Sequence, residues 1–297
     1  MRHSSPWDLD FASSRKEAQK HIGRKLEILS PLVRTGHALL YDCRKVCSDD
    51  TDAVVAVSFR QCLEFVDSVD LLLRHLIIAP AIGQARSALE SAACTCYLAK
   101  KRDPVLSAAF LLSSMRHLKH ELERKMESPH LDEEDRRAIR AEIEYVENHC
   151  ATLATDHASR TALAALRNLG RSRAWYSILN GPQNIHRLME DIGIGDLSQI
   201  YSDLNSAVHE GMPPLGFVGA DGRPVDPSSA EWLRPLRAPS PWSFRPVMVG
   251  GLALKISLVT TAGYFLPRLP GWLSRLEEFR VEHNRRCEAG EMTMLSL

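Results

Sequence analysis

The polar residues best suited to chemistry lie in one short stretch, Tyr-Ser-Asp-Leu-Asn-Ser-Ala-Val-His-Glu-Gly at positions 201–211. The pattern predicts a helix that opens after Asp196. Residues three and four apart are neighbours on a helix, so Tyr201, Asn205 and His209 share one side. His209 is suited to act as a general acid or base, with Asn205 or Tyr201 positioning the reacting group.

The same stretch also fits a purely structural role. Val208 lies on the same side, which places this polar group at the edge of a core, where buried polar side chains need partners. The helix dipole and Glu210 can hold a histidine near a helix C-terminus without any catalysis. The sequence leaves both interpretations of His209 open.

A second candidate pair is Arg86 and Glu90, which are four residues apart and share a face of another predicted helix, 81–101. That helix is rich in Ala, Ser and Cys, and we expect it to be central because small residues allow close helix approach. Arg86 is suited to present a fixed positive fork to a phosphate or carboxylate, with Glu90 orienting it. The alternative is a buried Arg–Glu pair that only stabilises the fold. In either case we expect this pair to supply the partners that Tyr201 needs.

Motifs for metals and cofactors do not match. His117 and His120 are three apart, and Arg124 is the fourth residue after His120, so the metalloprotease pattern His-Glu-x-x-His fails. There is no glycine-rich phosphate loop and no Gly-x-Ser-x-Gly elbow. A metal-dependent hydrolase using His209 and Glu90 is the weakest hypothesis, because no ligand spacing supports it. We expect no metal and no cofactor.

Composition indicates a globular protein with a real core: of 297 residues, 44% are hydrophobic and 25% charged. Lys plus Arg and Asp plus Glu both count 37, so the formal net charge is zero, which argues against nucleic-acid binding driven by global charge. A local basic patch is still compatible with a net charge of zero. Seven cysteines without a Cys-x-x-Cys pair indicate free thiols in a reducing cytoplasm, with a zinc site as the minor alternative. The apolar segment 247–266 contains Lys255, so we interpret it as a central bundle helix and expect no membrane partner.

Helical periodicity without strand alternation predicts one all-α domain, a multi-helix bundle over residues 14–297 behind a loose arm, 1–13. The charged segment 104–148 is expected to form a projecting helical hairpin. Prolines and glycines crowd residues 212–246, which predicts a long loop. The expected helices cover 14–29, 31–46, 52–79, 81–101, 104–127, 132–148, part of 151–171, a short segment ending at Asp191, the segment after Asp196, 247–266 and 271–287.

The chain resembles a bacterial family of helical domains of unknown function, which combines Arg-x-x-x-Glu on one helix with Tyr…Ser-x-x-His at the end of a later one. The residues that carry this resemblance are Arg86, Glu90, Tyr97, Trp175, Tyr201, Ser206 and His209. It covers roughly residues 50 to 270. The end motif is also similar to the HEPN superfamily of helical nucleotide-binding proteins, common in toxin–antitoxin and phage-defence systems.

The HEPN ribonuclease signature is Arg, a polar residue, three further residues and His. Asn205 and His209 match the polar position and the His, but Leu204 stands where the signature has Arg. The resemblance implies binding of RNA or a nucleotide, with Arg86 on phosphate, His209 as acid or base, and Asn205 and Tyr201 orienting; if Arg86 replaces the missing Arg, it implies a metal-independent ribonuclease. It also implies a homodimer. The alternative is a noncatalytic interaction module with a structural polar cluster and a protein partner.

Overall fold

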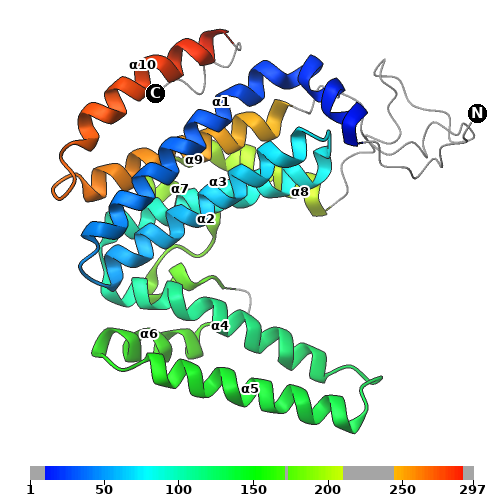
Figure 1. Cartoon of the computed structure of the whole chain (residues 1–297). Coiled ribbons are helices and arrows are strands. Elements are labelled where there is room, and N and C mark those ends of the chain that lie inside the picture. Colours follow the sequence, from blue (N-terminus) through cyan, green and yellow to red (C-terminus); the bar gives the residue numbers. More distant parts are fainter. Residues whose placement is uncertain (1–10, 171–172, 210–243, 290–297) are drawn as a thin grey trace, which may run out of the picture. The chain divides into compact units, whose positions relative to one another are not determined.

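The computed structural model describes residues 11–170, 173–209 and 244–289. The helices are α1 (Phe11–Val46), α2 (Asp50–Leu73), α3 (Ile78–Lys101), α4 (Pro104–Met126), α5 (Glu133–Leu153), α6 (His157–Asn168), the 3-10 segment η1 (Trp175–Asn180), α7 (Ile185–Ile192), the 3-10 segment η2 (Gly195–Leu197), α8 (Ser198–His209), α9 (Phe244–Phe265) and α10 (Trp272–Ala289). These residues contain no β-strand, so the predicted all-α multi-helix fold is confirmed (Figure 1).

Side-chain caps set several helix starts where the sequence predicts them. The Asp103 carboxylate accepts hydrogen bonds from the backbone N–H groups of Val105 (2.7 Å) and Leu106 (3.4 Å), and Pro104 occupies the first helical position of α4. Asp132 caps α5 in the same way through the N–H of Asp135, at 2.8 Å. These carboxylates satisfy backbone donors that have no partner within the helix.

The first two predicted helices are one helix in the structure, so the expected break at Ser30-Pro31 is wrong. Pro31 lies inside α1, which runs without interruption from Phe11 to Val46. A proline removes one backbone hydrogen bond from a helix interior. The residues around it, Leu29 and Leu32, are fully buried, and burial on both sides of Pro31 outweighs that loss.

Two other prolines lie in first turns of helices rather than at helix ends. The helix expected over 52–79 ends at Leu73, the chain turns through Leu76 (φ 55°), and Pro80 is the third residue of α3. Pro246 is likewise the third residue of α9, so the expected loop 212–246 is wrong by three residues at its end. A proline is tolerated in a first turn because the N–H that it lacks has no helical partner there. Residues 210–243 of the expected loop, and 1–10 of the expected arm, lie outside the described residues.

The chain forms two compact units. Unit 1 comprises the described parts of 1–46, 56–96 and 196–297, and unit 2 comprises those of 47–55 and 97–195. The single domain expected over 14–297 stays a prediction.

In unit 1, α1 packs along α9 and α10 (Figure 1). Helices α2 and α3 approach closely enough for polar contacts between small side chains: the hydroxyls of Ser58 and Thr95 are 2.9 Å apart, and Ser91 donates to the Ser58 carbonyl at 3.0 Å. The small residues of α3 that make this approach possible are fully buried, which confirms the expectation of a central helix. They are Ala81, Ala85, Ala88, Ala92 and Ala93.

Helix α9 has the length and composition of a membrane span, yet 61% of its most apolar window is buried in the structure. It lies against α1, and Val247, Leu254 and Leu258 are fully buried. This arrangement agrees with the interpretation of the segment as a core helix.

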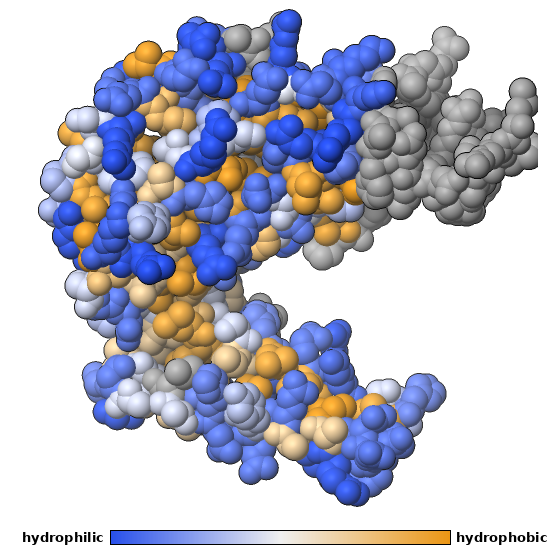
Figure 2. All heavy atoms as spheres, in the orientation of Figure 1, coloured by the Kyte–Doolittle hydropathy of each residue, from blue (hydrophilic) through white to orange (hydrophobic). Residues whose placement is uncertain are grey.

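In unit 2, α4 packs against both α5 and α6. Hydrophilic side chains predominate over the α4–α5 pair, and apolar ones show between the two helices (Figure 2). The charged helical pair expected over 104–148 is therefore present, and α6 adds a third helix to it. Trp175 of η1 packs edge-on against Phe110 of α4, at 5.3 Å between ring centroids.

Candidate functional site

Arg86 of α3 and Tyr201 of α8 meet in unit 1, as expected. The Arg86 Nη2 donates a hydrogen bond to the Tyr201 hydroxyl at 2.7 Å, and the guanidinium lies over the tyrosine ring at 5.1 Å. The two helices are also close at Gly83, where an added Cβ would lie 4.0 Å from Val208 Cγ2. Arg86 thus contacts Tyr201 through both its charge and its flat face.

Glu90 completes this group, which we call the Arg86 cluster (Arg86, Glu90 and Tyr201). Its Oε2 accepts a hydrogen bond from the Tyr201 hydroxyl at 3.4 Å and lies 3.7 Å from Arg86 Nη2. Burial and the Glu90 charge raise the pKa of Tyr201 against the opposing effect of Arg86. Tyr201 therefore stays protonated, accepts from the arginine and donates to the glutamate.

The Arg86 cluster is partly open. The Tyr201 residue is only 5% exposed, whereas the side chains of Arg86 and Glu90 are 23% and 40% exposed. The Arg86 Nε is buried and has no hydrogen-bond partner among the described residues. A guanidinium has five N–H donors, so this arginine is fixed in place without being saturated.

The other predicted site residues on α8 are only partly placed. Asn205 is half-buried one turn after Tyr201. His209 is the last residue of α8, and its side chain lies outside what the structure describes. Leu204, the residue before Asn205, is 4% exposed and belongs to the core.

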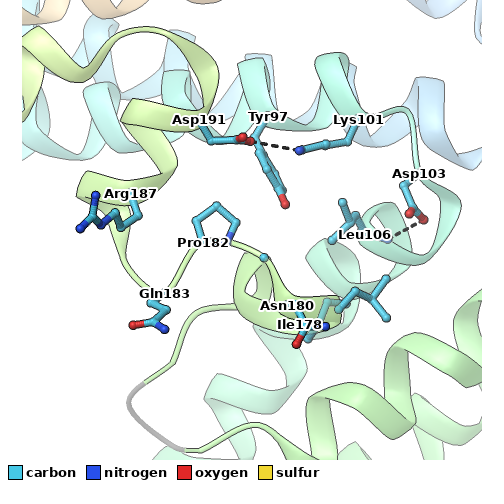
Figure 3. A pocket seen from close by; sticks show the side chains of 12 residues that line it. Tyr97, Lys101, Asp103, Leu106, Ile178, Asn180, Pro182, Gln183, Arg187 and Asp191 are labelled. Carbon is cyan, nitrogen blue, oxygen red and sulfur yellow. Dashed lines mark hydrogen bonds and ion pairs between the residues drawn. The ribbon is translucent and has the colours of Figure 1, made fainter.

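A second group of polar residues surrounds a cavity of about 610 Å³ in unit 2, which sequence reasoning did not predict as a site. We call it the Tyr97 cavity. The residues that line it come from the end of α3, the start of α4, η1 and α7 (Figure 3). The polar ones are Tyr97, Lys101, Asp103, Asn180, Gln183, Arg187 and Asp191, and the apolar ones are Leu106, Ile178, Leu179 and Pro182.

The Tyr97 ring forms part of the cavity and is held from behind by aromatic packing. Tyr97 is 3% exposed, and its ring centroid lies 6.2 Å from that of Trp175. Its hydroxyl points into the cavity (Figure 3) and has no hydrogen-bond partner among the described residues. Tyr97 and Trp175 are among the residues that carry the family resemblance. Their presence in that motif was the signal in the sequence that could have indicated the cavity.

The charged groups of the Tyr97 cavity are unevenly paired. Lys101 Nζ lies 3.2 Å from Asp191 Oδ2, and Arg187 is paired outside the cavity with Glu190 at 2.6 Å. Asp103 has no ion pair with any described residue. Burial, Asp191 and Asp103 together raise the pKa of Tyr97, so its hydroxyl keeps its proton.

The turn on the opposite wall has an unusual backbone. Leu179 (φ 53°) and Asn180 (φ 62°) are both left-handed although neither is glycine. Each such residue costs about 1–3 kcal/mol, and such costs are found most often where a chain shapes a ligand site. A Cβ on the next residue, Gly181, would lie 2.0 Å from the Tyr176 carbonyl oxygen and 3.1 Å from the Tyr97 hydroxyl, so only glycine fits here.

The described ranges contain no group of three or more His, Cys, Asp or Glu side chains that could hold a metal ion. His120 Nδ1 is instead 2.9 Å from Glu123 Oε2. All seven cysteines are free, as predicted.

The model of a protein family of unknown function, DUF5677, matches residues 52–222, more than half of the chain. The chain belongs to DUF5677. The expected membership in a family of unknown function is thus confirmed in this form, although the match ends at 222 rather than near 270. The match spans the Arg86 cluster and the Tyr97 cavity, so both lie within the region that defines DUF5677 members. No curated protein and no solved structure is significantly similar to the chain.

Proposed function

We propose that this DUF5677 protein binds RNA or a nucleotide, and that the Arg86 cluster receives a phosphate. The observation that carries the proposal is an arginine whose guanidinium is held by Tyr201 at 2.7 Å and whose side chain is still 23% exposed. Fixing a guanidinium before the ligand arrives lowers the entropy lost on binding. Arginine is the usual residue for such planar recognition of phosphate.

The charge of the cluster favours one kind of phosphate. Glu90 lies 3.7 Å from Arg86 and offsets part of its positive charge. The second charge of a terminal phosphate gains little here, because its attraction to Arg86 is offset by repulsion from Glu90, while a dianion costs more to desolvate than a singly charged phosphodiester. We therefore favour an internal phosphodiester of RNA over the terminal phosphate of a nucleotide.

Cleavage is a separate question, because the HEPN signature is incomplete here. Leu204 is buried, so a side chain at this position does not reach a phosphate. In a ribonuclease site of this protein, the phosphate would therefore be bound by Arg86. His209 then serves as acid or base from the end of α8, with Asn205 between it and Tyr201. This is the form in which we propose metal-independent RNase activity, in a bacterial stress or defence setting.

The test compares RNA binding of the wild type, Arg86→Gln and Arg60→Gln by fluorescence anisotropy with a labelled single-stranded RNA. Arg60 is a matched control: it also pairs with a glutamate four residues on, Glu64, at 2.7 Å, but its side chain is 65% exposed. We expect Arg86→Gln to weaken binding about tenfold or more, the value of a charge-assisted hydrogen bond, and Arg60→Gln to change it little. Equal affinities of the two variants refute the proposal.

RNA cleavage is scored in parallel with a chelator present. Loss of cleavage in His209→Ala at unchanged thermal stability supports the ribonuclease form. Intact RNA with the wild type, at the same time as normal binding, limits the function to binding.

One observation favours the alternative, a noncatalytic interaction module. Tyr201 is almost fully buried and bonds to both Arg86 and Glu90, which is how a polar group that fixes helix register is built. In that case Arg86→Gln and Tyr201→Phe lower the free energy of unfolding, RNA is not bound, and the function lies in binding a protein partner.

A further inference from the structure

The Tyr97 cavity has no role in the proposed RNA binding and contains a hydroxyl group that lacks a partner. The Tyr97 ring is packed, with the residue only 3% exposed, while its hydroxyl faces the cavity and forms no hydrogen bond with a described residue. Lys101 also lines the cavity, lies over the ring at 5.4 Å and pairs with Asp191. A ligand in the cavity would provide the missing partner.

The charges around the hydroxyl define what that ligand carries. Lys101 forms an ion pair with Asp191 Oδ2 at 3.2 Å but no hydrogen bond with it, so its N–H donors remain available for an acceptor. Asp103 uses Oδ1 to cap α4 and has no cationic partner among the described residues. One side of the cavity therefore offers donors, from Tyr97 and Lys101, and another offers an unpaired carboxylate. A molecule with a cationic donor beside an acceptor satisfies both.

We propose that the Tyr97 cavity binds an α-amino acid or the N-terminus of a short peptide. The ligand's ammonium group faces Asp103, and its carboxylate or first carbonyl accepts from the Tyr97 hydroxyl and Lys101. This assignment is independent of RNA binding at the Arg86 cluster.

The remaining walls favour an apolar side chain on this ligand. Leu106, Ile178 and Pro182 line the same cavity (Figure 3). A volume of about 610 Å³ holds more than one residue, so the cavity has room for a dipeptide. The left-handed pair Leu179–Asn180 and the missing side chain at Gly181 keep the turn clear of the Tyr97 hydroxyl.

Isothermal titration calorimetry with four probes tests the chemistry: leucine, leucinamide, the dipeptide Leu-Leu and N-acetylleucine. We expect leucine, the dipeptide or both to bind, and N-acetylleucine to bind at least tenfold more weakly because it has no ammonium group. If the dipeptide and leucinamide bind but leucine does not, the natural ligand is a peptide N-terminus. If leucine binds more tightly than the other probes, the natural ligand is a free amino acid. Failure of all four probes at millimolar concentration overturns the proposal.

Two pairs of variants locate the binding. Tyr97→Phe removes only the hydroxyl and should weaken binding about tenfold, whereas Tyr145→Phe, on a 66% exposed tyrosine of α5, should not. Asp103→Asn removes the charge but keeps an N-cap, since asparagine caps helices as well as aspartate. It should weaken binding at least tenfold, while Asp132→Asn, the same change at the cap of α5, leaves it unchanged. Equal binding by Asp103→Asn and Asp132→Asn contradicts the proposal.

Discussion

Replacing Gly181 with alanine tests the geometry of the turn that borders the Tyr97 cavity. The backbone of Gly181 (φ −69°, ψ −177°) is open to any residue, so conformational strain is not the obstacle. The obstacle is steric: the new Cβ would lie 2.0 Å from the Tyr176 carbonyl oxygen, and real Cβ atoms essentially never come within 3.0 Å of such an atom. The carbonyl must therefore move by about 1 Å, the difference between these two distances.

Overpacking of this kind costs about 1–3 kcal/mol. A backbone carbonyl next to the buried Trp175 cannot rotate away as a side chain can, so we expect about 3 kcal/mol for Gly181→Ala. Urea unfolding followed by tryptophan fluorescence measures the change. Gly263→Ala is the control, because nothing lies within 4 Å of a Cβ at that helical position of α9, and alanine there should be neutral or stabilise by up to about 1 kcal/mol. A Gly181→Ala protein as stable as the wild type refutes the packing argument.

Three further predictions follow from burial and charge. Leu204→Arg, which places an arginine directly before Asn205, should lower stability by several kcal/mol in urea unfolding and yield no new RNase activity, because position 204 is 4% exposed. Native iodoacetamide labelling with mass spectrometry should leave Cys62 and Cys94 unmodified until the protein unfolds, since burial raises the pKa of both thiols. A hydrogen bond from Lys45 lowers the pKa of Asp42 below 3.8, so Asp42 stabilises the fold above that pH and the contribution is lost as pH falls through the lowered pKa. Stability of Asp42→Asn should accordingly fall less between pH 5 and 3, and an unchanged acid profile would contradict this.

The helix starts that have a side-chain cap were predictable because the cap is a local interaction. Asp103-Pro104 and Asp132 set α4 and α5 through hydrogen bonds to residues two or three positions away. A short stretch of sequence contains both partners of such a bond. The turn at Asn180-Gly181-Pro182 and the end of α7 at Gly193 (φ 85°) were predictable for the same reason.

Proline positions were less reliable because their effect depends on tertiary packing. Pro31 resembles a helix start after Ser30, yet α1 continues through it because Leu29 and Leu32 are buried on either side. Local preference is a weak guide where a long helix buries an apolar face along its whole length. The outcome at Pro31 was therefore decided by neighbours that the local sequence does not contain.

The Arg86 cluster was predictable from an accounting of polar groups. Tyr201 on a partly apolar helix face requires a partner, and Arg86 and Glu90 are charged residues within the helix expected to be central. The structure unites these three, at 2.7 and 3.4 Å. Their exposure could not be predicted, because it depends on how many helices cover them.

The Tyr97 cavity could not be read from the sequence because it is built from separate segments that each have an ordinary local reason to exist. Asp103 caps a helix, Gly181 lies in a tight turn and Tyr97 packs as a buried aromatic residue. Each explanation is correct and incomplete: the cap uses one carboxylate oxygen, and the packed ring leaves its hydroxyl without a partner. Polar atoms left over after local structure is satisfied are the ones that a ligand can bind, and only their positions in space show that they face one another.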